Sequence, residues 1–222
     1  AVTWTSRTSG FGANDITTIA YGNGIFVAVG GNGTITTSTD GTTWTARSSG
    51  VSTNRLFRVR YINNLFVAVG AGANGGTGGI TTSTDGITWI ARSLPSQETW
   101  ASVSYGNQTF VAVANSSTGA ASSTDGITWT LRTLPSAASW ISVAYGNGVF
   151  TAVTSGSSTA ASSTDGITWT SQTSAADNSW NSVTYGNGLF VAVASTGTGN
   201  RVMTSPDGIT WTSQTSAADN SW

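Results

Sequence analysis

The chain has 222 residues, of which only 8% are charged, and its formal net charge is −1. All eight basic residues are arginines, so the chain lacks the broad basic surface that a nucleic-acid backbone requires, and we expect no nucleic-acid partner. No apolar run approaches the roughly 20 residues of a membrane-spanning helix, which argues against membrane insertion. Ten tryptophans predict a folded chain, because disordered segments lack large apolar groups.

A unit of about 40 residues recurs along the chain, and its most regular mark is a tyrosine. The intervals between successive tyrosines are 40, 44, 40 and 40 residues, for Tyr21, Tyr61, Tyr105, Tyr145 and Tyr185. We therefore treat residues 1–222 as one domain of five repeat units. A separate strand begins residues 1–15, and the units that follow are approximately 16–55, 56–99, 100–139, 140–179 and 180–222.

The first predicted element is a short strand, Val-Thr-Trp-Thr-Ser-Arg-Thr, around Trp4. Each later unit is predicted to contain four strands, because short apolar runs alternate with Asn-Gly and Asp-Gly turns. In the last unit these strands cover 180–185, 189–194, 201–205 and 209–214. Four antiparallel strands per unit, repeated five times, predict an all-β β-propeller with five four-stranded blades.

The count of fourth strands is uneven. Their tryptophan occurs six times, at Trp4, Trp44, Trp89, Trp129, Trp169 and Trp211, whereas each of the other strands occurs five times. We expect a terminal fourth strand to close the ring, since closure removes exposed strand edges. One such strand is then left over. Either the chain belongs to a longer repeat protein, or one end completes a blade in a neighbouring copy and gives a strand-exchanged oligomer or fibre.

A seven-residue phrase, Ser-Thr-Asp-Gly-Ile-Thr-Trp or a close variant, occurs five times. Its aspartates are Asp40, Asp85, Asp125, Asp165 and Asp207. The phrase resembles the Asp-box, or BNR repeat, of sialidase-like β-propellers. The resemblance implies that these aspartates lock the turn between the third and fourth strands, by accepting hydrogen bonds from backbone N–H groups. Here glycine directly follows aspartate, one residue closer than in the Asp-x-Gly spacing of the family.

A tryptophan precedes the first strand of several units, at Trp100, Trp140, Trp180 and Trp222. Near a loop face, such rings can stack on sugars, and we treat the first three as candidate ligand-binding residues. The alternative is packing between blades, which needs only a large apolar group. The same position in the first two units holds Ile16 and Leu56, and this favours packing.

The second unit carries arginines where other units have small residues. Arg58 and Arg60 lie on one face of the predicted innermost strand, which places a candidate anion site toward the central channel. The alternative is a solvated feature without a ligand. Length variation falls mainly between the second and third strands, including the glycine-rich segment 71–79, and variable loops on a rigid scaffold often carry binding sites.

Residues for catalysis are scarce. Histidine, cysteine and lysine are absent, Glu98 is the only glutamate, and five of the eight aspartates are assigned to turns. Glycoside hydrolysis generally needs two carboxylates at a controlled separation. We therefore expect no enzyme activity, no catalytic residues, no metal site and no cofactor.

The predicted function is recognition without catalysis, in which loops on one face of the propeller bind glycans or a cell surface. Each site would be weak, and avidity across the blades would supply the strength. Low charge suggests an extracellular or surface-displayed setting, such as a secreted or virion component. One alternative is a structural spacer or fibre subunit that self-associates through a terminal strand. Another is an amplified or engineered repeat propeller with no ligand.

Overall fold

The computed structural model describes residues 5–51, 53–72 and 79–221, and these contain 20 β-strands and no helix. None of the described segments is therefore a helix able to cross a lipid bilayer. The strands, in chain order, are β1 (Ile16–Gly22), β2 (Ile25–Gly30), β3 (Ile35–Ser38), β4 (Thr45–Arg47), β5 (Thr53–Ile62), β6 (Leu65–Gly72), β7 (Gly79–Ser83), β8 (Ile90–Arg92), β9 (Thr99–Gly106), β10 (Thr109–Asn115), β11 (Ser117–Ser123), β12 (Thr130–Ala138), β13 (Trp140–Gly146), β14 (Val149–Thr154), β15 (Thr159–Ser163), β16 (Thr170–Thr173), β17 (Trp180–Gly186), β18 (Leu189–Ala194), β19 (Val202–Ser205) and β20 (Thr212–Gln214).

The strands pair in chain order into antiparallel sheets. Three sheets have four strands each: β1–β4, β13–β16 and β17–β20. The eight strands β5–β12 form one larger sheet, in which β5–β8 and β9–β12 are joined by the single pair Ala71↔Thr99. The prediction of an all-β fold built from four-stranded antiparallel sheets is thereby confirmed.

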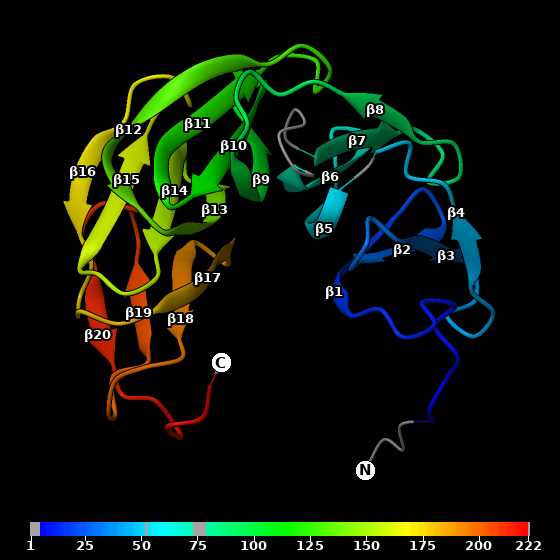
Figure 1. Ribbon diagram of the computed structural model, residues 1–222. Helices are drawn as coiled ribbons and strands as arrows, with labels where there is room; N and C mark the ends of the chain where they lie inside the picture. Colours follow the sequence, from blue (N-terminus) through cyan, green and yellow to red (C-terminus); the bar gives the residue numbers. More distant parts are fainter. Residues whose placement is uncertain (1–4, 52, 73–78, 222) are drawn as a thin grey trace.

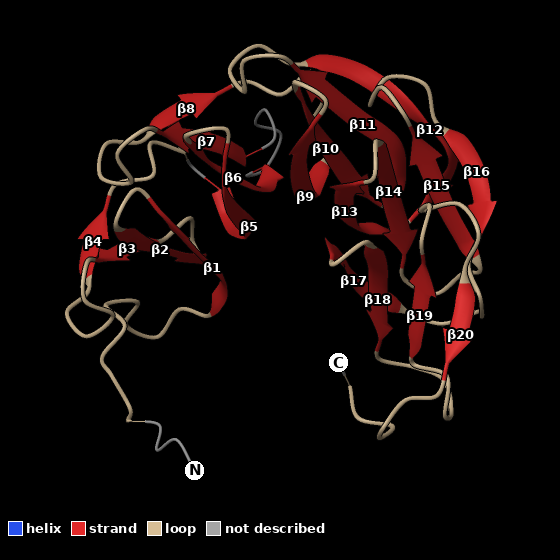
Figure 2. Ribbon diagram, turned by 180° about the vertical axis from the view of Figure 1, so that it is seen from behind, coloured by secondary structure: helices blue, strands red, loops and turns tan. Residues whose placement is uncertain are grey.

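The sheets lie side by side along an arc (Figures 1 and 2). Strands β1, β5, β9, β13 and β17 form its inner side, and β4, β8, β12, β16 and β20 its outer side. We call these the inner strands and the outer strands. The sheets β1–β4 and β17–β20 occupy opposite ends of the arc and do not meet in either view. The described residues therefore do not form the closed ring that we predicted.

We expected a terminal fourth strand to close the ring, and neither end of the described chain does so. Trp4 lies outside the described residues, and residues 5–8 form no strand. The segment that follows folds back on the first sheet, where Phe11 is buried beside Gly30. The side chain of Phe11 thus gains apolar contacts without pairing its backbone with β20, whose only strand partner among the described residues is β19.

Strand boundaries in the last unit differ from the prediction at one place. The first three strands begin and end within one residue of the predicted limits, but β20 begins at Thr212 and not at Ile209. The cause is the carboxylate of Asp207, whose Oδ1 atom accepts hydrogen bonds from the backbone N–H groups of Ile209 and Thr210, each at 2.9 Å. These two residues therefore belong to the turn.

The turn around Asp125 shows how the seven-residue phrase folds. Asp125 Oδ1 accepts hydrogen bonds from the backbone N–H groups of Ile127 and Thr128, both at 2.8 Å. The hydroxyl of Ser123 donates to the same oxygen at 2.8 Å and accepts from the Gly126 N–H at 2.9 Å. Gly126 has a φ of 71°, a conformation that a side chain disfavours. The same contacts recur at Asp40, Asp85, Asp165 and Asp207.

The core lies between neighbouring sheets. Val111 and Val113 of β10, for example, are fully buried in one cluster with Phe150 and Trp169 from the next sheet. A fully buried side chain of this size contributes about 1.5–3 kcal/mol to stability. The succession of such clusters from sheet to sheet makes the arc one continuous body.

A glycine ends several inner strands and packs directly against a tyrosine of the next sheet. A Cβ atom added to Gly106 would overlap the ring of Tyr145, and one added to Gly146 would overlap the ring of Tyr185. Gly22 and Tyr61 make the same contact. Glycine is needed at these places because the ring occupies the space of a side chain.

At each end of the arc, one side of such a sheet–sheet interface is exposed. Nothing lies within 4 Å of a Cβ added to Gly186, on the last inner strand. On the first inner strand, Ile16, Ile19 and Tyr21 are 51%, 55% and 60% exposed. The residues at the position of Ile16 on the later inner strands are fully buried: Leu56, Trp100, Trp140 and Trp180. We call these surfaces the end faces. Each has the composition of an internal interface but no partner sheet.

The glycine contacts generate a matched pair of stability predictions. Gly146→Val is expected to lower the free energy of unfolding by about 2 kcal/mol or more, because the new side chain overlaps Tyr185. Gly186→Val is expected to change it by no more than about 0.5 kcal/mol, because its surroundings are open. Urea denaturation followed by tryptophan fluorescence measures both. Equal losses in the two variants would contradict the packing described above.

The aspartate turns predict a loss of stability in acid. Hydrogen bonds from the Thr88 and Ile87 N–H groups lower the pKa of Asp85 to about 2, from about 4 in an unfolded chain. This contribution is therefore complete above about pH 4 and disappears as the pH falls toward 2. Asp85→Asn is expected to be less stable than the wild type at pH 7 and to lose less stability on acidification. Urea midpoints measured from pH 7 to pH 2 test this difference, and parallel curves for the two proteins would refute it.

Candidate functional site

The tryptophans proposed to stack on sugars lie in the core. Trp100, Trp140 and Trp180 are all 0% exposed, and Trp222 lies outside the described residues. Their indole Nε1–H groups donate to the carbonyl oxygens of Ser96, Ser136 and Ala176, respectively, at 3.1–3.4 Å. Sugar stacking requires an exposed ring face, and these three rings have none. The structure thus corrects the sugar-stacking interpretation in favour of packing between sheets.

Of the three arginines on β5, one is paired with an acidic residue. Arg55 Nη2 lies 3.1 Å from Asp15 Oδ2, and its guanidinium lies 5.9 Å from the centre of the Phe57 ring. Arg58 and Arg60 form no ion pair with the residues that the structure describes, and the buried Nε of each has no hydrogen-bond partner among them. The inner strand therefore carries two positive charges without a counter-charge.

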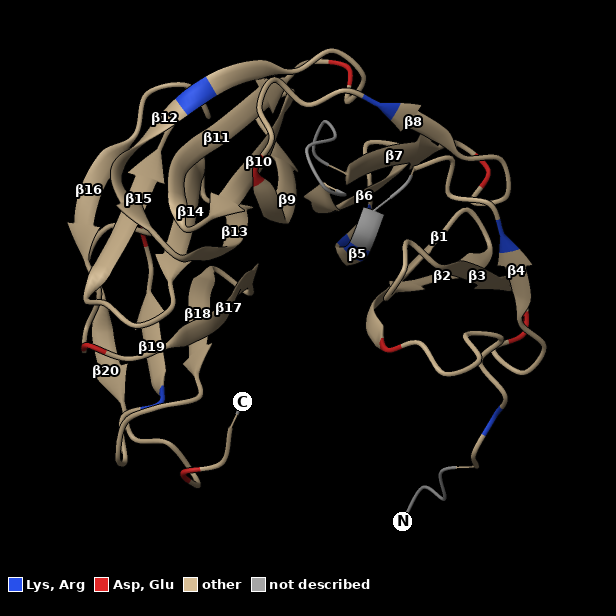
Figure 3. Cartoon of the chain, in the orientation of Figure 1, with Lys and Arg blue, Asp and Glu red and all other residues tan. Residues whose placement is uncertain are grey.

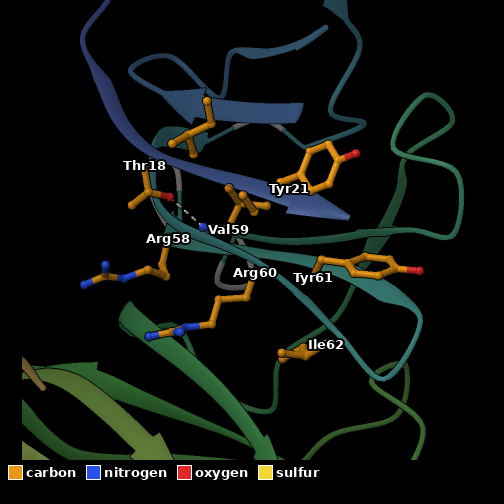
Figure 4. Close-up of a pocket in the computed structure, with 9 residues that line it drawn as sticks. Thr18, Tyr21, Arg58, Val59, Arg60, Tyr61 and Ile62 are labelled. Carbon is orange, nitrogen blue, oxygen red and sulfur yellow. Dashed lines mark hydrogen bonds between the residues drawn. The ribbon is translucent and has the colours of Figure 1, made fainter. Parts of the chain in front are cut away.

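Arg58 and Arg60 project to the same side of β5, away from Tyr21 and Tyr61 (Figure 4). Burial lowers the pKa of Arg58, and burial together with the positive charge of Arg58 lowers that of Arg60. An arginine still keeps its proton in a protein. The two guanidinium groups are thus charged, partly desolvated and close enough to repel each other, which is a favourable arrangement for an anion.

A cavity of about 290 Å³ lies between β1 and β5. Thr18, Tyr21, Arg58, Arg60 and Tyr61 are among the residues that line it (Figure 4). The hydroxyl of Thr18 accepts a hydrogen bond from the Val59 N–H at 2.9 Å and holds the two inner strands together. The cavity is therefore built on a rigid base and bordered by both unpaired arginines.

A second cavity, of about 210 Å³, borders Arg58 on the other side. It is lined by Phe57, Arg58, Thr99, Ala101, Asn115 and Ile141, which belong mainly to the inner strands β5, β9 and β13. We call it the inner-strand pocket. Sequence reasoning missed its apolar residues, although Phe57, Ala101 and Ile141 each precede the unit's tyrosine by four positions. Arg58 borders both cavities and thereby joins them into one candidate site.

The variable loops contribute one residue to this site. Asn115 ends β10, where the loop from the second to the third strand of its unit begins. Of the glycine-rich segment 71–79, which we predicted as a binding loop, residues 73–78 lie outside the described part of the chain.

The charge distribution sets β5 apart from the other inner strands. The remaining described arginines lie on outer strands or in loops, at Arg7, Arg47, Arg92, Arg132 and Arg201 (Figure 3). Arg132, for example, donates from Nε to the hydroxyl of Ser122 at 2.8 Å. Within the described ranges, no three acidic side chains gather in a way that could hold a metal ion. The other inner strands contain no charged residue, so the site is a cationic patch among uncharged strands.

Comparison with known proteins identifies the fold. No protein-family model and no curated protein matches the sequence. Among solved structures, catalytically inactive virginiamycin B lyase from Staphylococcus aureus with quinupristin has a TM-score of 0.79 at 11% identity, over 97% of this chain and 74% of that one. YCF48 bound to D1 peptide has a TM-score of 0.66 at 16% identity, over 91% and 67% of the two chains. The architecture is propeller-like.

A designed protein is also similar in fold. The computationally designed Ika8 protein has a TM-score of 0.51 at 12% identity and matches 90% of this chain and 73% of its own length. All three likenesses are below 25% identity and concern the fold alone.

The lyase corrects one expectation from the sequence. We expected no enzyme activity because the usual catalytic residues are scarce, yet virginiamycin B lyase is an enzyme with a similar fold. The architecture itself is therefore compatible with catalysis, and the expectation of no enzyme activity does not stand. At 11% identity, the similarity in turn transfers no reaction to this chain.

Because these tryptophans are buried, we expect their replacement to destabilise the fold. Trp140→Ala is expected to lower the free energy of unfolding by about 3–5 kcal/mol, because it leaves a large cavity between sheets. Trp140→Leu is expected to lose less, since leucine fills this position in the second unit. Chemical denaturation of both variants tests the role. Wild-type stability in Trp140→Ala would show that the ring is not part of the core.

Proposed function

We propose that this chain is a recognition module of the Asp-box propeller type, with five blades, and that it binds a segment of a protein partner over its inner strands. The proposal of five blades is supported by the 20 strands. They form five consecutive sets of four, and few backbone pairs join one set to the next. The Asp-box resemblance is supported by the recurring aspartate turns.

The inner-strand pocket is the observation that carries the proposal. Phe57, Ala101 and Ile141 give it an apolar wall, and Arg58, Thr99 and Asn115 place polar groups at its edge. A concave apolar site with a few polar groups is the usual form of a binding pocket. At about 210 Å³, it has the size for one side chain and adjoining backbone, and not for a large cofactor.

A protein segment suits this site better than a glycan. Glycan binding was expected to use the rings of three tryptophans, and these rings have no exposed face. YCF48, by contrast, is a propeller of similar fold whose structure was solved with a bound peptide. The low charge of the chain supports the extracellular or surface-displayed setting, where an uncharged surface with one cationic patch limits non-specific attraction.

Selection from a random peptide library on the whole protein tests the proposal. Peptides that bind the wild type are expected to bind Ala101→Phe at least about tenfold more weakly, because the larger ring fills the pocket. Ala46→Phe, on the exposed outer strand β4, is the matched control and is expected to bind normally. Recovery of no peptides above background, or equal binding to Ala101→Phe, would refute this function.

The end faces favour a second, structural function. Ile16, Ile19 and Tyr21 at one end and Gly186 at the other have the composition of an internal sheet interface. They support self-association or attachment of further sheets of the same repeat. Sedimentation velocity over a range of concentrations tests self-association. Gly186→Val is expected to reduce it without loss of stability, and a wild type that stays monomeric would contradict it.

A further inference from the structure

Neighbouring inner strands are linked by a repeated hydrogen bond. A hydroxyl oxygen on one strand accepts a hydrogen bond from a backbone N–H group of the next inner strand along the arc. Thr18 accepts from Val59 at 2.9 Å, and Ser102 and Ser142 do the same for the N–H groups of Val143 and Val183, at 3.3 and 3.2 Å. The acceptor is thus a small hydroxyl residue at one fixed position in the unit.

Arg58 occupies this position on β5, 40 residues after Thr18 and 44 before Ser102. A guanidinium group has donors and no acceptor, so Arg58 cannot make the link that the hydroxyl makes elsewhere. Arg60, two residues later, stands where other units have Ala20, Ser104 and Ala144. Both arginines thus place a charge at positions that are uncharged on the other inner strands.

These arginines are unfavourable for the isolated fold. The Nε atoms of Arg58 and Arg60 are buried without a hydrogen-bond partner among the described residues. Burying an unpaired charge is costly, and placing two like charges together adds repulsion. Arg55, on the same strand, shows the usual solution, since it is paired with Asp15. The two other arginines lack such a partner among the residues that the structure describes, and a ligand can supply one.

We propose that Arg58 and Arg60 form a clamp for one carboxylate group of the bound partner. This inference rests on the proposed binding function and specifies the chemistry of its ligand. The planar guanidinium fork matches the two oxygens of a carboxylate, and such pairs are short and strong. Because Arg58 also borders the inner-strand pocket, the carboxylate lies beside the apolar wall formed by Phe57, Ala101 and Ile141.

A carboxylate fits better than a phosphate. Phosphate sites typically add backbone N–H groups from a loop or a helix N-terminus. Here the arginines stand on an extended strand that is paired with β6, the described residues contain no helix, and the chain contains no lysine. Two guanidinium groups alone satisfy the oxygens of one carboxylate.

Titration of the whole protein with succinate, followed by the arginine Nε–H signals in NMR spectra, tests the clamp. Succinate in the millimolar range is expected to shift the signals of Arg58 and Arg60 in a saturable manner. Arg132 serves as an internal reference, because it lies on an outer strand and is hydrogen-bonded to Ser122. Its signal is expected to remain unchanged at constant ionic strength.

Variants identify the residues that hold the anion. Arg58→Gln and Arg60→Gln keep the length and polarity of the side chain but remove its charge. Each is expected to weaken succinate binding at least about tenfold, whereas the matched control Arg132→Gln binds like the wild type. Both clamp variants are also expected to unfold at a higher temperature than the wild type without ligand, because an unpaired charge is removed.

Three results would overturn the clamp: no saturable shift with succinate, an equal shift in Arg58→Gln, or a response to inorganic phosphate without a response to succinate. Failure of the clamp is distinguishable from failure of the proposed function. Library peptides that need Ala101 but bind both arginine variants normally would leave the function in place and refute the clamp. Succinate binding by a protein that selects no peptide would support the clamp and refute the proposed function.

Discussion

Burial of each sheet against its neighbour is the interaction on which the rest of the structure depends. The strands are short, and one repeat unit of about 40 residues cannot bury its apolar faces without a neighbouring unit. The contact between Gly146 and the ring of Tyr185 sets how closely two sheets approach, and Val111, Val113 and Phe150 fill the space between such sheets. The candidate site is held by this packing, since Arg58 and Ala101 stand on strands that contact other strands on both sides.

The sequence predicted local structure well because its repeats are nearly identical. Asn-Gly and Asp-Gly turns require positive φ, and residues such as Asn147 and Gly126 adopt it. The closed ring was not predictable in the same way. Ring closure depends on the angle between sheets, which no local pattern encodes, and on terminal residues such as Phe11, whose side chain packs on the first sheet.

The candidate site was predictable only in part. Arg58 and Arg60 could be recognised because the other units have small residues at these positions. They remain the best candidates for binding a ligand. Trp140 had been interpreted from residue type alone, and that interpretation failed because a large aromatic ring serves packing as well as it serves binding. Sequence reasoning could not single out Ala101, since its importance comes from the small size of its side chain. Its short side chain leaves the space that a ligand can enter.

The glycine–tyrosine contact has a consequence for how such a chain can change over generations. Gly106 meets Tyr145 in the same way as Gly146 meets Tyr185, and Gly22 meets Tyr61 likewise, so these three interior boundaries are built alike. Deletion or duplication of one whole unit by unequal recombination would join two surfaces that already fit. Copy number can therefore drift with little cost to folding, whereas loss of the second unit would remove Arg58 and Arg60 and, with them, the proposed binding site.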